Sequence, residues 1–223
     1  MALTVVRLAS IATITFCMLI ISTTAAAYDR EDARDYAQQY ALNPNPDYIY
    51  WSSSDCANFV SQSINHGGVA MNHDAGWYLW WIVGVIHPHW EWGTQWSVAQ
   101  DCHDYFKNSS RTSAYRTLVG TYDFDPDTSR PRADRICPGD MLRGDMISYD
   151  WDLWGGSTWT IDHLAICTGL NSVSTIKSTW QGDLKCQHTT NRYRTAWQCG
   201  DIHTEAEMEG YGFAVWRLST ALN

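Results

Sequence analysis

The sequence predicts an α+β protein in which helices come first and an antiparallel sheet follows. Apolar residues recur with a helical period near the start of the chain, over 29–42 and again over 56–65. After residue 139, short segments alternate apolar and polar residues, as half-buried strands do. No internal repeat, low-complexity tract or Pro/Gly linker interrupts this order. We therefore expect one domain over residues 28–223, with N-terminal helices packed on the sheet.

Three helices are predicted before the sheet. The first covers 29–42, where an apolar stripe repeats at three- and four-residue intervals and Asp29 is a suitable N-cap. The second covers 56–65, follows a run of serines and an aspartate, and ends at Gly67. The third covers 97–106 and is expected to begin at a serine cap.

Two long segments carry no clear periodicity. Residues 71–96 are polar apart from a dense group of tryptophans, and we predict a long loop or lid with short ordered pieces. Residues 107–139 are rich in Ser, Thr, Asp, Arg and Pro, which predicts mostly loop. The tryptophans of the first segment are Trp77, Trp80, Trp81, Trp90, Trp92 and Trp96.

Five strands are predicted after residue 139. Alternation is strictest over 163–168, where His163, Ala165 and Cys167 should face one side of the sheet and the residues between them the other. The full set of expected strands is 146–149, 163–168, 173–179, 184–189 and 213–218.

Composition and the N-terminus limit the class of function. The 223 residues carry a formal net charge of −9, which disfavours a nucleic-acid ligand because such binding depends on Lys/Arg clusters. Residues 1–27 have one early arginine, a short apolar stretch and a final Ala-Ala-Ala, the pattern of a cleaved secretory signal peptide. We expect a secreted protein with no stable membrane insertion after cleavage at Ala27.

Six cysteines follow the expected cleavage point. Cys167 lies in an apolar alternating run and is interpreted as a small core residue. Cys56 is interpreted as a free nucleophile, although a cysteine of a secreted protein is more often half of a disulfide. A bridge at Cys56 would end the catalytic hypothesis. The other four would pair most simply as Cys102–Cys137 and Cys186–Cys199.

A cysteine at a helix N-terminus points to thiol chemistry. Cys56 would lie in the first turn of the second helix, where free backbone N–H groups favour the thiolate and can hold an oxyanion. His163, at the start of a strand, is the candidate general base. His188, on the following strand, is the candidate group that orients the base, because adjacent strands would bring the two rings together. Asp162 and Asn191 are the reserve candidates for that role, and Asp55 would support the start of the helix.

Several motifs resemble one known family in the same order. The block Asp55-Cys56-Ala57-Asn58-Phe59-Val60-Ser61-Gln62 resembles the nucleophile motif of the putative amidase domain family, and more distantly that of NlpC-type cell-wall peptidases. Asp162-His163-Leu164-Ala165-Ile166 and Gln187-His188-Thr189 resemble its strand motifs. The resemblance implies a papain-like or NlpC-like fold, with Cys56 as nucleophile, His163 as base and His188 as its orienting partner. The implied reaction is amide or peptide hydrolysis, and we expect a peptide or peptidoglycan-like substrate. No motif of the sequence indicates a cofactor or metal, and none is expected.

The tryptophan-rich segment leaves the function partly open. Its rings either pack the segment onto the sheet, which we favour, or line a substrate groove, for which Trp77, Trp80 and Trp81 are the candidates. The alternative function is a catalytically inactive, Trp-rich module that binds carbohydrate or peptide on the same scaffold. Acyl transfer to an amine is a further alternative within the enzyme class, because transglutaminases share the order Cys then His.

Overall fold

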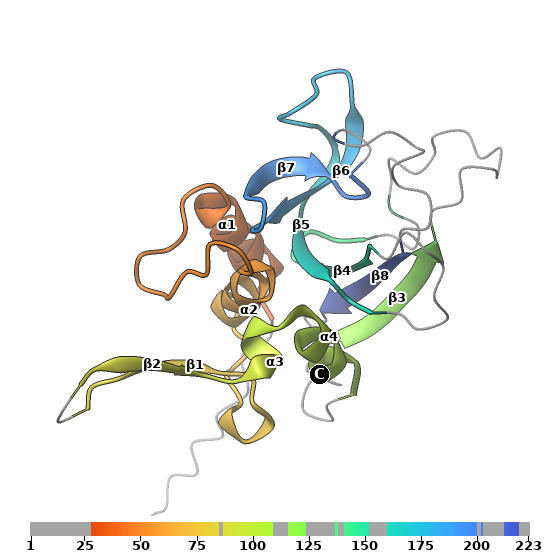
Figure 1. Cartoon of the computed structure of the whole chain (residues 1–223). Helices are drawn as coiled ribbons and strands as arrows, with labels where there is room; N and C mark the ends of the chain where they lie inside the picture. Colours follow the sequence, from red (N-terminus) through yellow and green to blue (C-terminus); the bar gives the residue numbers. More distant parts are fainter. Residues whose placement is uncertain are drawn as a thin grey trace, which may run out of the picture.

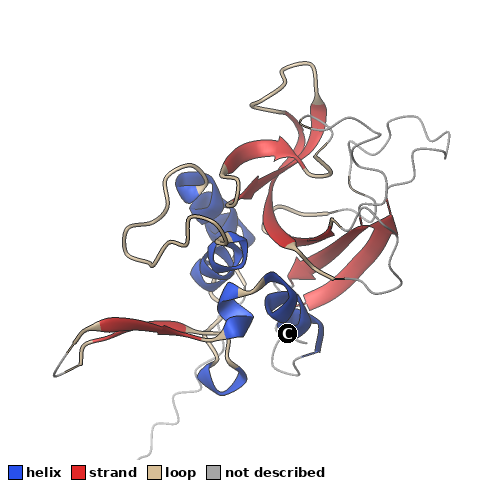
Figure 2. Ribbon diagram, viewed as in Figure 1, coloured by secondary structure: helices blue, strands red, loops and turns tan. Residues whose placement is uncertain are grey.

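A computed structural model describes most of the chain after the expected leader. It covers residues 28–84, 87–108, 116–123, 137, 141–151, 160–199, 202 and 212–218. The predicted signal peptide and much of the predicted loop over 107–139 lie outside these residues. Figure 2 shows helices on one side of an antiparallel sheet, which confirms the predicted α+β class. No described helix combines the length and apolar character that crossing a membrane requires.

The described helices are α1 (Arg30–Tyr40), α2 (Cys56–His66), α3 (Thr94–Ser97) and α4 (Ala99–Asn108), with a short 3-10 turn, η1, at His73–Ala75. The first two confirm the predicted helices. Asp29 caps α1, because its carboxylate accepts from the backbone N–H of Glu31 and of Asp32. The predicted cap of the third helix is wrong: Ser97 ends α3, and its hydroxyl donates to the Gly93 carbonyl.

Six described strands form one antiparallel sheet in the order β3-β8-β4-β5-β6-β7 (Figure 1). Hydrogen bonding continues from β8 through β4 and β5 to β6, so the centre of the sheet comes from the C-terminal half of the chain. The strands are β3 (Arg116–Asp123), β4 (Met146–Asp150), β5 (His163–Val173), β6 (Gln181–Gln187), β7 (Arg192–Ala196) and β8 (Gly212–Leu218).

The strand predictions hold in the centre of the sheet and fail at its edges. β4, β5, β6 and β8 confirm four of the expected strands, with shifted ends for β5 and β6. The strand expected over 173–179 is wrong, because Val173 ends β5 and the chain then turns back into β6. β3 and β7 were not expected. Both lie at an edge of the described sheet, where one side of the ladder has no described partner strand and the apolar pattern is weak.

The tryptophan-rich segment contains a hairpin rather than a loop. β1 (Leu79–Ile82) pairs with β2 (His89–Trp92), and Trp81 lies opposite Trp90 in the register. In Figure 1 this two-stranded ribbon projects away from the main sheet beside α3. Its ends are held by a close approach of two backbones, since a Cβ on Gly93 would lie 1.8 Å from the Gly76 carbonyl oxygen.

The two faces of the sheet belong to different hydrophobic cores. Leu164 and Ile166 of β5 pack with the helices, in the core that contains Phe59 of α2. Ala165 and Cys167 point the other way, into a second core away from the helices. The alternation predicted for this strand is therefore confirmed. It decides which side chains of the strand face α2 and which face the second core.

Candidate active site

Cys56 is the first residue of α2, as predicted, and its thiol is almost enclosed. The side chain is 7% exposed. Hydrogen bonds from the backbone of Leu164, of Ala57 and of Cys56 itself reach the sulfur and lower its pKa. The thiol thus lies between the first turn of α2 and the start of β5. Three backbone donors converge at one atom, which is the local geometry that would hold an anion there.

The expected preference for the thiolate is not met in this structure. Burial raises the pKa of Cys56, and this effect exceeds the lowering by the backbone donors; the neighbouring Asp55 carboxylate raises the pKa further. The resting group is therefore the neutral thiol at pH 7. A nucleophile in this state needs a base that removes its proton when the substrate is bound.

Asp55, the residue before Cys56, forms a buried pair with His188. His188 Nδ1 lies 2.5 Å from Asp55 Oδ2, and the two side chains are each 2% exposed. His188 Nε2 donates to the Tyr40 carbonyl oxygen at 2.8 Å, because a carbonyl can only accept. The imidazole also stacks on Phe59, with ring centroids 4.2 Å apart. Both ring nitrogens are occupied, and the pair joins residues 133 positions apart in the chain.

The turn after β6, which contains His188 and Thr189, also holds the backbone at the start of α2. The Asp55 N–H donates to Thr189 Oγ1 at 2.8 Å. The other carboxylate oxygen of Asp55 accepts from the Trp51 N–H at 3.1 Å and from the Asn58 amide at 2.7 Å. Asp55 therefore does not cap α2 with its side chain. Its bonds instead attach the start of α2 to the turn after β6 and to the loop before the helix.

His163 lies on the face of β5 opposite to the helices. Its ring stacks on Trp151, with centroids 4.5 Å apart, and lies beside Tyr149 of the second core. Burial lowers the pKa of His163 well below its ordinary value, the Lys185 ammonium lowers it further, and a hydrogen bond with Gln187 opposes both effects. The imidazole is neutral at pH 7. Its Nε2 atom is buried, and no residue in the described ranges forms a hydrogen bond with it.

The predicted contact between His163 and His188 is therefore wrong. His188 follows the end of β6 and points to the helix side, where Asp55 and Tyr40 occupy its nitrogens. His163 points to the other side. The backbone of Leu164, the residue after His163, contacts the Cys56 sulfur. The predicted base is thus next in sequence to a residue that touches the thiol, but its own ring faces away. Alternation along the strand explains the outcome, since neighbouring residues face opposite sides.

The reserve candidates do not contact His163 either. The carboxylate of Asp162 is exposed to solvent and accepts from the Trp151 backbone N–H at 3.0 Å. The Asn191 side chain accepts from the Thr189 backbone N–H at 3.4 Å. Asp162 and Asn191 thus hold turns next to the predicted site. The side chain that does lie beside His163 is Gln187.

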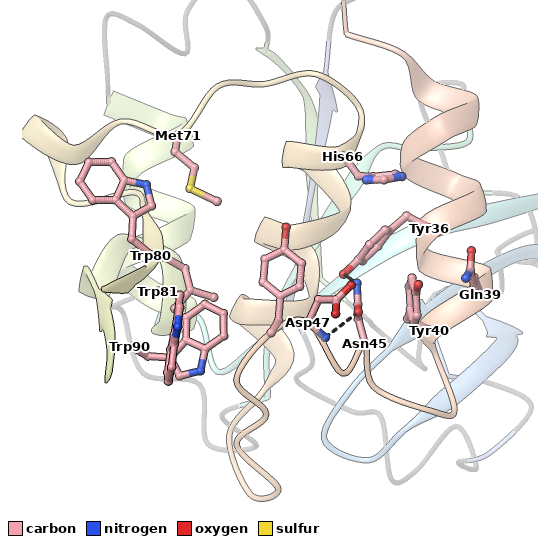
Figure 3. Close-up of a pocket in the computed structure, with 12 residues that line it drawn as sticks. Tyr36, Gln39, Tyr40, Asn45, Asp47, His66, Met71, Trp80, Trp81 and Trp90 are labelled. Carbon is pink, nitrogen blue, oxygen red and sulfur yellow. Dashed lines mark hydrogen bonds between the residues drawn. The ribbon is translucent and has the colours of Figure 1, made fainter. Parts of the chain in front are cut away.

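The three groove candidates divide between core and surface. Trp77 is fully buried, and its indole N–H donates to Ser61 Oγ at 3.0 Å, so its assignment to a groove is wrong. Trp80 and Trp81 are 41% and 49% exposed. Together with Trp90 they line a pocket against α1 (Figure 3). Cys56, His163 and His188 do not line this pocket.

The two predicted disulfides are also wrong. All six cysteines in the described part of the chain are unbridged. Cys102 belongs to the helix-side core and Cys137 to the second core, and the same division separates Cys186 from Cys199. Cys199 instead accepts from the buried Lys185 ammonium at 3.0 Å. Cys167 is a fully buried core residue, as predicted.

Sequence reasoning missed the pairing of Asp55 with His188. Both residues lie in motif blocks that were singled out, Asp55 beside Cys56 and His188 in Gln187-His188-Thr189. The available signal was that a carboxylate beside the nucleophile needs a partner if it is buried. The sequence does not reveal that burial, so the histidine was assigned to the wrong neighbour.

The fold and the site define an α+β protein with a buried thiol at the N-terminus of a helix that packs on an antiparallel sheet. Residues 27–211 match the family described as "Putative amidase domain", and the chain belongs to this family. Membership makes an amidase, a hydrolase of C–N bonds, the general role that the family description supports.

Two curated relatives, both from Bacillus subtilis (strain 168), are similar to parts of the chain. The uncharacterized protein YjcM is 40% identical over 50 residues, which are 22% of this chain and 12% of YjcM. The uncharacterized protein YhbB is 28% identical over 133 residues, 57% of this chain and 34% of YhbB. The chain thus spans about a third or less of the length of these relatives. No solved structure matches the chain.

Proposed function

We propose that this protein is a cysteine-dependent amidase that hydrolyses an amide bond through a thioester on Cys56. The observation that carries the proposal is the position of the thiol in the first turn of α2, with backbone donors from Cys56, Ala57 and Leu164 directed at the sulfur. Negative charge at this point is stabilised by the helix N-terminus. Membership of a putative amidase family supports the class of reaction.

The proposed reaction has two halves. The sulfur of Cys56 attacks the amide carbonyl carbon as the thiol proton leaves, and the carbonyl oxygen becomes an oxyanion held by backbone N–H groups. The C–N bond then breaks, the amine departs with a proton, and a thioester remains. Water attacks the thioester, the acid product leaves, and the thiol recovers its proton.

His163 is the proposed base, because its neutral imidazole has a buried nitrogen that no described residue hydrogen-bonds and that can accept a proton. It is also the neighbour of Leu164, which contacts the sulfur. In the described structure the ring faces the other side of β5, so the proposal requires its reorientation when the substrate binds. His188 is proposed as a positioning residue that holds Asp55 and the start of α2 in place.

The proposed substrates are amide bonds in cell-wall peptides, and the proposed location is outside the cell. The signal-peptide pattern over residues 1–27 supports export. The resemblance of the Cys56 block to NlpC-type peptidases supports a peptidoglycan-like substrate. Both statements go further than the family description, which names the amidase class alone.

The test is the release of free amine from purified peptidoglycan and from its isolated stem peptides. Cys56→Ala should abolish release without changing the unfolding midpoint by much. Cys102→Ala is the matched control, because it removes another buried free thiol from the same core and should retain activity. His163→Ala should lower the rate by two to four orders of magnitude, the usual contribution of a general base.

Each outcome separates the candidate functions. Activity that survives in Cys56→Ala would refute the thioester mechanism. Product that appears only when an amine acceptor is supplied, as a conjugate, would favour acyl transfer. A folded chain that retains the peptides without releasing amine would favour the inactive binding module, for which the exposed Trp80 and Trp81 are the supporting observation.

A further inference from the structure

A second site lies away from Cys56, between the β1–β2 hairpin and α1. It is a pocket of about 620 Å³ whose walls carry different chemistry (Figure 3). The hairpin wall is aromatic, with Trp80, Trp81 and Trp90. The α1 wall is polar and tyrosine-rich, with Tyr36, Gln39 and Tyr40. The volume falls within the range of small-molecule sites, roughly 300–1,000 Å³.

The aromatic wall is held rigidly. Trp81 and Trp90 are register partners in the hairpin and meet edge to face, with centroids 5.3 Å apart. Trp90 is nearly parallel to Tyr48, at 14° and 6.4 Å, so the hairpin rests on the loop that follows α1. Trp80 stacks on His73 at 10° and 4.9 Å. Packed neighbours therefore fix the indoles, yet about half of Trp81 remains open to solvent.

Two polar side chains of the pocket, those of Asp47 and Gln39, are available to a ligand. Asn45 is already used, because its amide donates to the Tyr36 hydroxyl and its oxygen accepts from the Asp47 N–H. In contrast, no hydrogen bond or ion pair within the described part of the chain involves the carboxylate of Asp47 or the amide of Gln39. Both residues are exposed. Hydrogen-bonding groups that no described residue engages thus stand opposite a wall of tryptophan rings.

We propose that this pocket binds an uncharged oligosaccharide. A sugar ring has an apolar C–H face, which can stack on an indole, and a rim of hydroxyls, which suits carboxylate and amide groups at the opposite wall. Acidic glycans are disfavoured, because Asp47 lies in the pocket and the whole chain carries a formal charge of −9. The site goes beyond the proposed amidase reaction and does not rest on it, since Cys56, His163 and His188 lie elsewhere.

Binding is tested with the Cys56→Ala chain, so that turnover cannot remove the ligand. The chain is first applied to an array of uncharged, amino, sulfated and uronic-acid oligosaccharides. The best uncharged trisaccharide is then titrated calorimetrically. We expect saturable binding that Trp81→Ala weakens about tenfold or more. Trp92→Ala is the matched control, because Trp92 is 42% exposed on the same hairpin but does not line the pocket, and its affinity should be unchanged.

A third variant keeps the test valid if Trp81→Ala disturbs the hairpin. Gln39→Ala removes an exposed side chain from the opposite wall and should weaken binding while the circular dichroism spectrum and unfolding midpoint stay the same. Retention of no uncharged glycan, or equal weakening by Trp81→Ala and Trp92→Ala, would overturn the proposal. Selective binding of tetramethylammonium that Asp47→Asn abolishes would overturn it as well, because the pocket would then be a cage for cations. Amidase activity is measured separately, with the same substitutions made in the chain that retains Cys56.

Discussion

His188→Ala should destabilise this protein strongly, although the residue lies just past the end of β6. The replacement removes the partner of a carboxylate that is buried with it, since both side chains are 2% exposed. Breaking a buried pair from one side costs about 3–5 kcal/mol, because the remaining charge is left without compensation. The lost bond to the Tyr40 carbonyl adds about 1 kcal/mol. The expected loss is therefore about 4–6 kcal/mol, a large part of the roughly 5–15 kcal/mol that stabilises a domain.

The assay is equilibrium unfolding in urea, followed by tryptophan fluorescence. His66→Ala is the matched control: this histidine is exposed, its described contact is a ring contact with Tyr36, and its loss should cost under about 1 kcal/mol. A double-mutant cycle with Asp55→Asn isolates the pair, because Asn retains an oxygen for the Trp51 N–H. If His188→Ala costs no more than His66→Ala, or if the two changes at the pair are additive, the pair does not hold the start of α2.

Three further predictions concern other groups. Labelling of Cys56 with iodoacetamide should be slow at pH 7 and accelerate as the pH rises through and above 9, because burial raises the pKa of this thiol; fast labelling below pH 7 would contradict the structure. Burial lowers the pKa of His103 to about 4, and its Nδ1 accepts from the donor-only indole N–H of Trp216. As the pH falls from 6.5 to 4, the imidazole of His103 is protonated in the unfolded chain but stays neutral in the folded chain. The free energy of unfolding should therefore fall by on the order of 2 kcal/mol across this window. The urea midpoint of His103→Gln should fall less over the same range. Trp77→Ala should cost about 3–5 kcal/mol and Trp80→Ala much less, because the first ring is buried and the second half exposed; similar unfolding midpoints for the two would refute this division.

The sequence was most informative where local patterns determine structure. The stripe of α1 and the cap at Asp29 predicted a helix that the structure contains. The alternation over β5 predicted which residues share a face, and the two cores confirm it. Cys56 was placed correctly at a helix N-terminus for the same reason: the preceding serines and aspartate and the following apolar period are local signals.

Long-range geometry was not available from the same patterns. His163 was assigned to Cys56 because a strand follows a helix in the expected order, but order does not say which face of the strand the helix covers. His188 was assigned to His163 because adjacent strands pair, yet it lies past the end of β6 and points to the helices. The hairpin at Leu79–Trp92 was missed because its tryptophans follow no clean period, and cross-strand ring contacts hold it together instead.

The bond between Asp55 and His188 also sets an order of events during synthesis. A ribosome completes the first helices long before it reaches residue 188, so Asp55 has no partner while most of the chain is being made. The thiol-bearing end of α2 reaches its final environment only after β5 and β6 have been added. A chain that stops early, or one whose C-terminal third is lost to proteolysis, would therefore carry Cys56 without the surroundings that enclose it.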